Sequence, residues 1–432
     1  MSGHEFHPPE LKISSQRPIS KLPLPKLVVL PLQQHTGAMA QATVKAGDQV
    51  TKGQVVGDSN QYVFAPIHAS ISGKVKAVSP WLHPTLGREV ESVVIEGGED
   101  VDELRLKPLR MSISPQDIVL RAREAGLVGL GGAAFPTAVK LSPNKPIEVV
   151  IINGAECEPY ITVDHRQMLE NPEKIVLGLK LIMMAVGAVE GIIAVEDNKK
   201  DAATVLTEAI KGEKTLRATL LPTKYPQGAE KVLIKTLLNK EVPRGGLPLD
   251  VGVVVSNVST AICLTEAVLE GKVLTERVIT VSGDLVQEPA NVLVTLGTLV
   301  KDIAESFFKG SEEPFKVVTG GPMTGIAQSS LDVPVIKGTS GILFLRKHEE
   351  FVPGECIRCG RCVRVCPLKL MPLYIASNTR LEDYVRAEYF GALDCFECGI
   401  CAYVCPASIP LVHYVKVAKA EIFSRRKASP KS

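Results

Sequence analysis

Between Ser114 and about Ala267, segments with one apolar face alternate with short runs that are apolar throughout. The stretches PQDIVLRAREAGLVGL (115–130), which ends in glycines, and DAATVLTEAIKG (201–212) have the spacing of amphipathic helices. IEVVIING (147–154) and GIIAVED (191–197) are apolar without alternation, as in strands buried on both faces. This order of helices and buried strands predicts an α/β layer with a largely parallel sheet.

One apolar stretch is long enough to be weighed as a membrane span, IVLGLKLIMMAVGAVEGIIAV at Ile175–Val195. Lys180 and Glu190 interrupt it, and it contains glycines. A buried helix that begins near Pro172, followed by the strand at 191–197, fits this pattern better than a span. The stretch therefore predicts part of the α/β layer, and work at a membrane would require another anchor.

On the N-terminal side of this layer the pattern changes to short β-rich runs. VKAGDQVTKGQVVG (44–57) and APIHASISGKV (65–75) contain Gly turns and resemble the small β-sandwich of biotinyl and lipoyl carriers. Those carriers present a modified lysine at a hairpin tip, where this chain has His68 and no lysine. We therefore expect the carrier fold without the carrier chemistry.

On the C-terminal side, RVITVSG, ANVLVTLG, FKVVTGG and GILFL predict strands between 277 and 345, and LVKDIAESFF (299–308) predicts one helix. From about residue 350 the chain carries most of its cysteines, separated by a segment with a helical pattern. At 432 residues the chain is too long for one core. We predict four domains: a β-rich barrel-sandwich region at 1–110, the α/β domain at 111–270, a smaller β-rich domain at 271–347, and a helical domain with a basic tail at 348–432.

The composition, with 45% hydrophobic and 22% charged residues and a net charge of +2, gives no reason to expect nucleic acid as a partner. The N-terminal sequence has no apolar core of a signal peptide, so secretion is not expected. The tail from Lys416 is basic. Two interpretations stay open for it, a solvated terminus or a segment that docks on an anionic membrane face or an acidic partner.

Eight of the ten cysteines fall in two copies of one phrase, CIRCGRCVRVCP (356–367) and CFECGICAYVCP (395–406). A Cys-x-x-Cys-x-x-Cys turn supplies three thiolates to one [4Fe–4S] cube, and the fourth cysteine, just past the turn, reaches the other cube. A zinc site would not require the third cysteine, and a disulfide scaffold conflicts with the missing signal peptide. We predict two clusters, one held by Cys356, Cys359, Cys362 and Cys405, the other by Cys395, Cys398, Cys401 and Cys366.

The two phrases differ in charge. The first contains Arg358, Arg361 and Arg364, whereas the second contains Glu397 and no cation. Nearby positive charge stabilises a reduced cluster, so the first cluster is expected to have the higher reduction potential. The alternative is that these arginines face solvent or a partner protein.

Two stretches of the α/β layer have the residue types of a flavin or nucleotide site. GLVGLGGAAFPTAVKL (126–141) places small residues between two helical patterns, where backbone N–H groups can bind a phosphate and a flat ring can approach the chain. Glu156 and Glu158 directly follow a buried strand, where α/β sheets bind ligands. A helix-packing turn and a solvated turn are the respective alternatives.

The motifs GGAAFPT (131–137), NGAECEP (153–159), YPQGAEKVLI (225–234) and SNVST (256–260) occur in the order and approximate spacing of the NADH- and FMN-binding flavoprotein of respiratory complex I. With the two cysteine phrases behind them and FHPPELK (6–12) near the start, nearly the whole chain resembles the family of C subunits from Rnf electron-transport complexes. The resemblance implies a Rossmann-like FMN/NADH domain, a β-grasp-like domain after it, and a helical two-cluster ferredoxin-type domain.

The resemblance also implies which residues contact the cofactors. Glu158 and Glu230 would face the nicotinamide nucleotide, with Tyr225 near its ring. Non-covalently bound FMN would be contacted by Gly129, Gly131, Gly132, Ala133, Phe135, Lys140, Asn153, Glu156, Gly228, Ser256, Asn257 and Thr260. The chain departs from the complex I pattern at four positions, which are Leu130 (usually Arg), Ala134 (Gly), Ala155 (Asp) and Ala229 (Glu).

Together these implications predict an enzyme, the peripheral electron-transfer subunit of an ion-translocating NADH:ferredoxin oxidoreductase on the cytoplasmic side of the inner membrane. NADH or NAD⁺ would exchange hydride at FMN, and the clusters would carry single electrons. Its partners would be ferredoxin-like and integral membrane subunits and, indirectly, ferredoxin. An electron-conducting adaptor with a degenerate nucleotide site is the alternative. A component of a soluble hydrogenase-type complex is a third possibility, against which the N-terminal sandwich and the paired clusters argue.

Overall fold

The apolar runs at 147–154 and 191–197 form neighbouring strands of a four-stranded parallel sheet with the order β11-β10-β9-β12. The strands are β9 (Val149–Gly154), β10 (Glu190–Glu196), β11 (Leu216–Leu221) and β12 (Val253–Asn257). β9 and β10 are buried along nearly their whole length, which explains why their sequences do not alternate. The predicted parallel α/β layer is confirmed.

Six helices accompany this sheet: α1 (Pro115–Glu124), α2 (Thr137–Lys140), α3 (Val163–Glu170), α4 (Pro172–Val186), α5 (Lys200–Ala209) and α7 (Val258–Leu269). α4 packs against α7 at Gly178, where a Cβ atom would lie 2.3 Å from the carbonyl oxygen of Ala261. The stretch Ile175–Val195 is thus a buried helix followed by β10, as predicted. Among the residues that the structure describes, no helix has both the length and the hydropathy of a membrane span.

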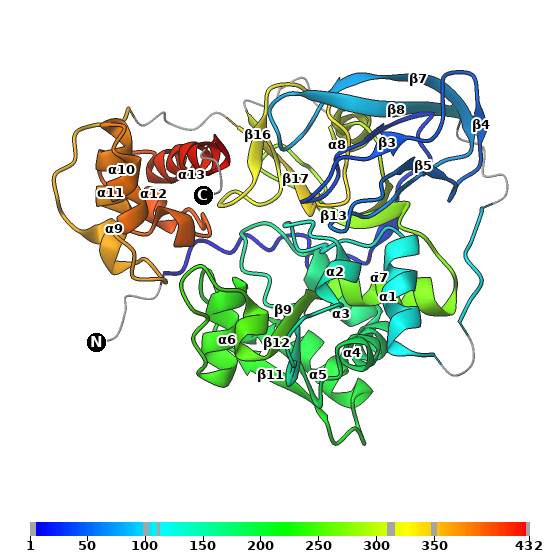
Figure 1. Cartoon of the computed structure of the whole chain (residues 1–432), viewed down its shortest axis with the longest axis horizontal. Coiled ribbons are helices and arrows are strands. Elements are labelled where there is room, and N and C mark those ends of the chain that lie inside the picture. The colour runs from blue at the N-terminus through cyan, green and yellow to red at the C-terminus, as the bar shows by residue number, and fades with distance from the viewer. Residues whose placement is uncertain (1–5, 98–102, 110–112, 309–315, 347–351, 429–432) are drawn as a thin grey trace. The chain divides into compact units, whose positions relative to one another are not determined.

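The N-terminal region forms two small antiparallel sheets, with β7 and β8 as its longest strands (Figure 1). One contains β2 (Leu27–Pro31), β8 (Glu89–Gly97), β7 (Gly73–Leu82) and β4 (Gln49–Val50), and the other contains β3 (Gln41–Ala42), β5 (Val55–Asp58) and β6 (Ile67–His68). The expected sandwich is confirmed. His68 is buried rather than presented, and the Nζ atom of Lys337 donates a hydrogen bond to the adjacent Pro66 carbonyl (2.6 Å).

The β-rich region after the α/β layer forms a mixed sheet with the order β1-β14-β13-β17-β15-β16. It contains β1 (Ser20–Lys21), β13 (Glu276–Ser282), β14 (Ala290–Thr295), β15 (Lys316–Thr319), β16 (Ile326–Gln328) and β17 (Gly341–Leu345), and helix α8 (Val300–Phe307) follows β14. β13 and β17 are parallel neighbours, and each pairs antiparallel with its outer neighbour. This is the strand arrangement of a β-grasp, as expected.

The cysteine phrases belong to a helical unit that contains α6 (Glu230–Leu238), α9 (Arg361–Arg364), α10 (Pro372–Arg380), α11 (Tyr384–Tyr389), α12 (Ile400–Tyr403) and α13 (Leu411–Ala428). α10 and α11 pack against α13 (Figure 1). The Phe6 ring contacts the rings of Tyr225 and Tyr403, with centroids 6.3 and 5.0 Å away. Residues 223–247, although they lie between β11 and β12 in sequence, therefore pack with the cysteine-bearing helices.

The computed structural model describes residues 6–97, 103–109, 113–308, 316–346 and 352–428. The chain divides into two compact units. We call them the cluster unit (Met1–Glu10, Thr223–Leu247 and His348–Ser432) and the sheet unit (Leu11–Pro222 and Pro248–Lys347). The predicted domain boundary after residue 270 falls between α7 and β13, while those near 110 and 347 lie outside the described residues. The four-domain division itself stays a prediction.

Candidate functional site

The sheet order reverses between β9 and β12, because β10 and β11 lie on one side of β9 and β12 on the other. In parallel α/β sheets, ligands bind outside the carboxyl ends of the strands at such a switch point. Asn153 near the end of β9 is the register partner of Asn257 at the end of β12, with Ser256 beside it. Three of the residues predicted to contact FMN thus meet at this point of the sheet.

The glycine-rich segment between α1 and α2 lies against the junction of β12 and α7. The Leu130 backbone N–H donates to the Thr260 hydroxyl (2.9 Å), and Lys140 Nζ donates to the Val255 carbonyl (2.9 Å). A Cβ atom on Gly131 would lie 3.3 Å from the Cβ of Asn257. The segment therefore brings Gly129, Gly131, Gly132, Ala133, Phe135 and Lys140 to the same place as Ser256, Asn257 and Thr260.

The tip of this segment is open to a ligand. Gly131, Gly132 and Ala133 are exposed, and a Cβ atom on Gly132 would meet no atom within 4 Å. Gly132 has φ +112°, a conformation that residues with a side chain rarely adopt. The exposed backbone thus leaves space for a flat or anionic group beside the start of α7.

Asn257 caps the N-terminus of α7, since its side-chain oxygen accepts from the Ser259 N–H (2.8 Å). Its amide nitrogen donates to the carboxylate of Asp164 (2.8 Å). Burial, and secondarily the negative charge of Glu156, raise the pKa of Asp164 to about 7. The switch point therefore includes a carboxyl group that titrates near neutral pH, at a residue the sequence did not single out.

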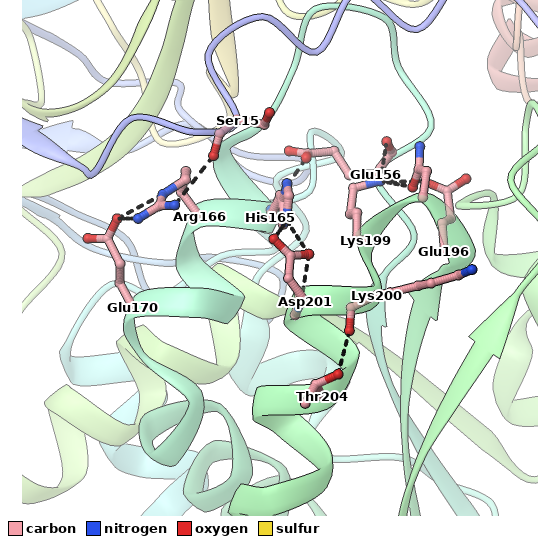
Figure 2. Close-up of polar contacts among 12 residues, drawn as sticks. Ser15, Glu156, His165, Arg166, Glu170, Glu196, Lys199, Lys200, Asp201 and Thr204 are labelled. Carbon is pink, nitrogen blue, oxygen red and sulfur yellow. Dashed lines mark hydrogen bonds and ion pairs between the residues drawn. The ribbon is translucent and has the colours of Figure 1, made fainter.

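Glu156 directs its carboxylate to the start of α3, as Figure 2 shows. Its two oxygens accept from the backbone N–H groups of Asp164 (2.8 Å) and His165 (3.4 Å). The His165 ring is itself held by Asp201, with Nε2 2.9 Å from a carboxylate oxygen. The predicted flavin contact at Glu156 thus also orients the loop between β9 and α3.

Behind this loop lies a buried pair of opposite charges. The Nζ atom of Lys199 donates to Glu196 (2.9 Å) and, at 3.4 Å, to the Glu156 carbonyl (Figure 2). Both side chains are almost fully buried, and Glu196 ends β10. Burial raises the pKa of Glu196 although the Lys199 charge opposes that shift. The buried charges of Glu196 and Lys199 at the end of β10 are therefore paired with each other, beside the loop that follows β9.

Glu158 is half-buried and contacts a loop of the β-grasp region. Its carboxylate accepts from the Met323 N–H (3.0 Å) and from the Thr324 hydroxyl. Burial raises the pKa of Glu158. The structure thus gives Glu158, predicted to face the nicotinamide nucleotide, two donors from the chain itself.

Tyr225, Gly228 and Glu230 belong to the cluster unit, whereas the other predicted flavin and nucleotide residues belong to the sheet unit. The Tyr225 hydroxyl donates to the Cys398 carbonyl (2.7 Å), and Glu230 begins α6. Between them, the Gln227 side chain is fully buried, with no partner for either amide atom within the described chain. The contact of Tyr225 with a cysteine turn was not predictable from the sequence motifs.

Three observations indicate that the switch point of the sheet unit can accommodate the phosphate and the ring of a flavin. The exposed glycine tip leaves open space, Asn257 caps a twelve-residue helix at the switch point, and the Thr260 hydroxyl ties these two elements together. The positive end of a helix and free backbone N–H groups are what an anionic phosphate requires. Leu130, where the complex I pattern has arginine, is buried and supplies no cation.

The two cysteine phrases adopt the same backbone at positions 39 residues apart. Arg358 and Glu397 both have positive φ (54° and 61°), as do Gly360 and Gly399 (71° and 83°). The short helices α9 and α12 follow at matching positions. Each phrase therefore forms the tight turn that presents three cysteines toward one side.

One group of thiols shares a cavity of about 60 Å³, lined by Cys356, Cys359, Cys362 and Cys405. In the other group, burial and the neighbouring thiols Cys395 and Cys366 raise the pKa of Cys398 to about 12. Burial, and secondarily the neighbouring thiols Cys395, Cys398 and Cys366, raise the pKa of Cys401 further. Each group has four thiols, three from one phrase and one from the other, and this donor set fits a [4Fe–4S] cube.

The two cysteine groups differ in their surroundings. Cys356 and Cys359 are exposed, as are the three arginines of their phrase, and Arg364 donates to the Cys359 carbonyl (3.0 Å). In the second phrase, Glu397 is paired with Lys419 (2.6 Å). The second phrase is therefore nearly neutral and covered, whereas the first is cationic and open.

Three family models match successive stretches of the chain. Residues 4–100 match the RnfC barrel sandwich hybrid domain, residues 122–266 match the Nuo51 FMN-binding domain, and residues 355–409 match a 4Fe-4S dicluster domain. The C subunit of the proton-translocating ferredoxin:NAD(+) oxidoreductase complex of Clostridium ljungdahlii is 44% identical over 96% of this chain and 92% of its own length. The chain belongs to the RnfC family.

Other relatives support the same membership. The C subunit of the Na(+)-translocating ferredoxin:NAD(+) oxidoreductase complex of Acetobacterium woodii is 45% identical over 98% of this chain and 97% of its own length. The C subunit of the ion-translocating oxidoreductase complex of Rhodobacter capsulatus is 41% identical over 98% of this chain and 83% of its own. The RnfC-family chain described here combines an FMN-binding domain with a dicluster domain.

A solved NAD⁺-reducing [NiFe]-hydrogenase in the H₂-reduced state shares the fold with a TM-score of 0.50 and 19% identity. The similarity covers 72% of this RnfC-family chain and 61% of the hydrogenase chain. At this identity the likeness concerns the fold alone.

Proposed function

We propose that the chain is the peripheral electron-transfer subunit of a membrane-bound, ion-translocating ferredoxin:NAD⁺ oxidoreductase. The observation that carries the proposal is the combination, in one RnfC-family chain, of a switch-point site suited to FMN with two groups of four cysteines. FMN, when bound, exchanges hydride with NADH as an electron pair and exchanges electrons singly with iron–sulfur clusters. A chain that holds both groups can therefore join pairwise to single-electron chemistry.

The residues of the sheet unit would bind and orient the flavin. The backbone of Gly131–Ala133 and the N-terminus of α7 offer N–H groups to its phosphate, while Asn257 and Thr260 fix these two elements against each other. Lys140 adds a cation within the same segment. Asp164, with its pKa near 7, can hold or release a proton beside Asn257.

Glu158, Tyr225 and Glu230 would contact the nicotinamide nucleotide, and Asn153, Glu156, Gly228 and Ser256 would complete the flavin contacts. This assignment rests on the family pattern and, for the sheet-unit members, on their place at the ends of β9 and β12. The eight thiols would hold two [4Fe–4S] clusters, with Cys405 and Cys366 crossing over.

Relatives named as subunits of ion-translocating complexes suggest the setting. The chain would assemble with integral membrane and ferredoxin-like subunits on the cytoplasmic side of the cell membrane. Two arginines near the end of α13 are engaged within the cluster unit, Arg425 over the Tyr384 ring and Arg426 with Glu388. The basic tail thus contributes to folding as well as offering charge to an anionic surface.

An anaerobic spectroscopic experiment tests the proposal. Protein reconstituted with iron, sulfide and FMN is mixed with NADH, and the flavin and cluster absorption bands are followed. Bleaching of the flavin band followed by cluster reduction is the expected result. If the flavin stays oxidised after NADH is added, while dithionite still reduces the clusters, the result favours the alternative of an electron-conducting adaptor. The departures from the complex I pattern at Leu130 and Ala155, both buried, and at Ala229 support that alternative.

A further inference from the structure

Lys12 closes the FHPPELK motif, for which the sequence suggested no role. Its ammonium group donates hydrogen bonds to three backbone carbonyls, those of Glu156 (2.8 Å), Glu158 (2.7 Å) and Ile161 (2.7 Å). A lysine ammonium has three N–H donors, so the contact uses all of them. The three acceptors lie 144 to 149 residues away, in the loop between β9 and α3.

This loop has a conformation that its own sequence does not favour. Tyr160 has φ +65°, in the left-handed region that a residue with a side chain rarely adopts. Three carbonyls that converge on one cation fix the peptide planes between 156 and 161. The contact from Lys12, in the N-terminal segment, therefore stabilises a backbone conformation that is unfavourable at Tyr160.

The loop carries the two glutamates of the proposed site. Glu156 binds the start of α3 through its carboxylate, and Glu158 binds Met323 and Thr324. Next to Lys12, the hydroxyl groups of Ser14 and Thr162 form a 2.6 Å hydrogen bond, which continues the attachment beyond Ile161. Lys199 reaches the Glu156 carbonyl only at 3.4 Å and is engaged by Glu196, so it does not duplicate the contact.

We propose that Lys12 is a positioning residue for the flavin–nucleotide site, because its ammonium group holds the loop 156–161 in the conformation that places Glu156 and Glu158. This inference rests on the proposed function. The three hydrogen bonds that Lys12 donates all end on backbone carbonyls, so it acts through the loop and not on a reacting group.

The test compares Lys12→Met and Lys12→Arg with Lys21→Met, which removes an exposed lysine of the same N-terminal segment. Two quantities are measured on the full-length protein. Backbone hydrogen exchange of residues 156–162 is followed in the flavin-free form, and the FMN dissociation constant is obtained from flavin fluorescence quenching.

For Lys12→Met we expect exchange in 156–162 to accelerate about ten-fold or more while exchange in β9 stays unchanged, and the FMN dissociation constant to rise about ten-fold. Lys12→Arg, which keeps the charge and donors, should recover part of both effects, and Lys21→Met should match the wild type. An unchanged FMN affinity in Lys12→Met, or equal acceleration throughout the sheet unit, would overturn the inference.

The two proposals can fail separately. If the wild type and Lys21→Met bind no FMN, the proposed function fails, whatever happens at Lys12. If they bind FMN and Lys12→Met binds it equally well, the positioning role fails and the proposed function stands.

Discussion

The hydroxyl of Tyr225 donates a 2.7 Å hydrogen bond to the backbone carbonyl of Cys398, the second cysteine of the second phrase. Arg244 and the Gly245 N–H, from the same segment, bind the Asp394 carboxylate at 2.8 and 2.9 Å. Residues 223–247 thus contact the second cysteine turn, whereas Cys356 and Cys359 of the first are exposed. The two cluster sites, similar in backbone, differ in what covers them.

Tyr225→Phe should lower the reduction potential of one cluster. The O–H dipole places positive charge near Cys398, which favours the reduced cluster, so its loss should shift the midpoint by roughly 20–40 mV. An anaerobic redox titration followed by electron paramagnetic resonance measures this. Tyr374→Phe, in a tyrosine stacked on Phe390, is the control, and equal shifts in both clusters would contradict the prediction.

Cys405→Ala and Cys366→Ala test the crossing of ligands between the phrases. Each variant should lose one cluster, so that iron falls from about eight to about four atoms per chain. Cys405→Ala should lose the cluster of the first phrase and retain the cluster held by Cys398. The retained cluster should therefore be the one whose reduction potential responds to Tyr225→Phe, although Cys405 and Cys398 belong to the same phrase. Retention of the other cluster would show that each phrase holds its own cube.

Arg361→Glu should lower the potential of the first cluster. Since Arg361 is exposed, water and salt weaken its effect, and we expect roughly 20–40 mV at low ionic strength and less at high salt. The same redox titration at two salt concentrations measures the shift. Lys211→Glu, an exposed lysine of the sheet unit, controls for net charge, and an unmoved midpoint for Arg361→Glu would mean that the arginines serve a partner or solvent only.

Thr260→Val should weaken FMN binding. It leaves the Leu130 N–H without its acceptor, at a cost of about 1–3 kcal/mol, and frees the glycine segment from α7. We expect the FMN dissociation constant to rise about ten-fold. Thr265 lies on the same helix as Thr260, and its buried hydroxyl donates to the backbone carbonyl of Lys174 on α4. Thr265→Val should therefore leave FMN affinity unchanged. Equal losses in both variants would indicate general destabilisation.

Asp164→Asn should change the pH dependence of stability. The folded-state pKa of Asp164 is raised from 3.8 to about 7, so the folded protein favours the protonated carboxyl. That contribution is complete below about pH 4 and is lost as the pH rises through about 7. Between pH 5 and 8 the wild type should lose on the order of 2 kcal/mol relative to Asp164→Asn, measured as the difference in denaturation midpoints. A constant difference would contradict the assigned titration.

Local pattern was sufficient for the elements of the fold. The apolar runs at 147–154 and 191–197 became β9 and β10, and Pro172 and Gly187 bounded α4 as a helix start and stop. The cysteine turns were also predictable, since the spacing within each phrase determines which thiols face one cube. In each case the determining residues are neighbours in sequence.

Contacts between distant segments were not predictable in this way. Nothing near Lys12 indicates that its acceptors lie beyond residue 150, and nothing near Glu158 points to Thr324. Asp164 looked like an ordinary first-turn residue of α3, and only burial beside Glu156 and Asn257 makes it titrate near neutral pH. FHPPELK was the one signal that could have led to Lys12, because it marks an otherwise unexplained polar segment.

The cluster unit is assembled from three stretches of chain, and this affects how the protein can be taken apart. A fragment that starts at residue 348 carries every cysteine of both phrases but lacks Phe6, Tyr225 and Arg244. Its second turn would keep Lys419 on Glu397 and the Cys395 carbonyl but lose the contacts from Tyr225 and Arg244, so it would be more exposed to solvent and oxidants. If this ferredoxin-like fragment were fused to another enzyme, residues 223–247 would therefore have to be included.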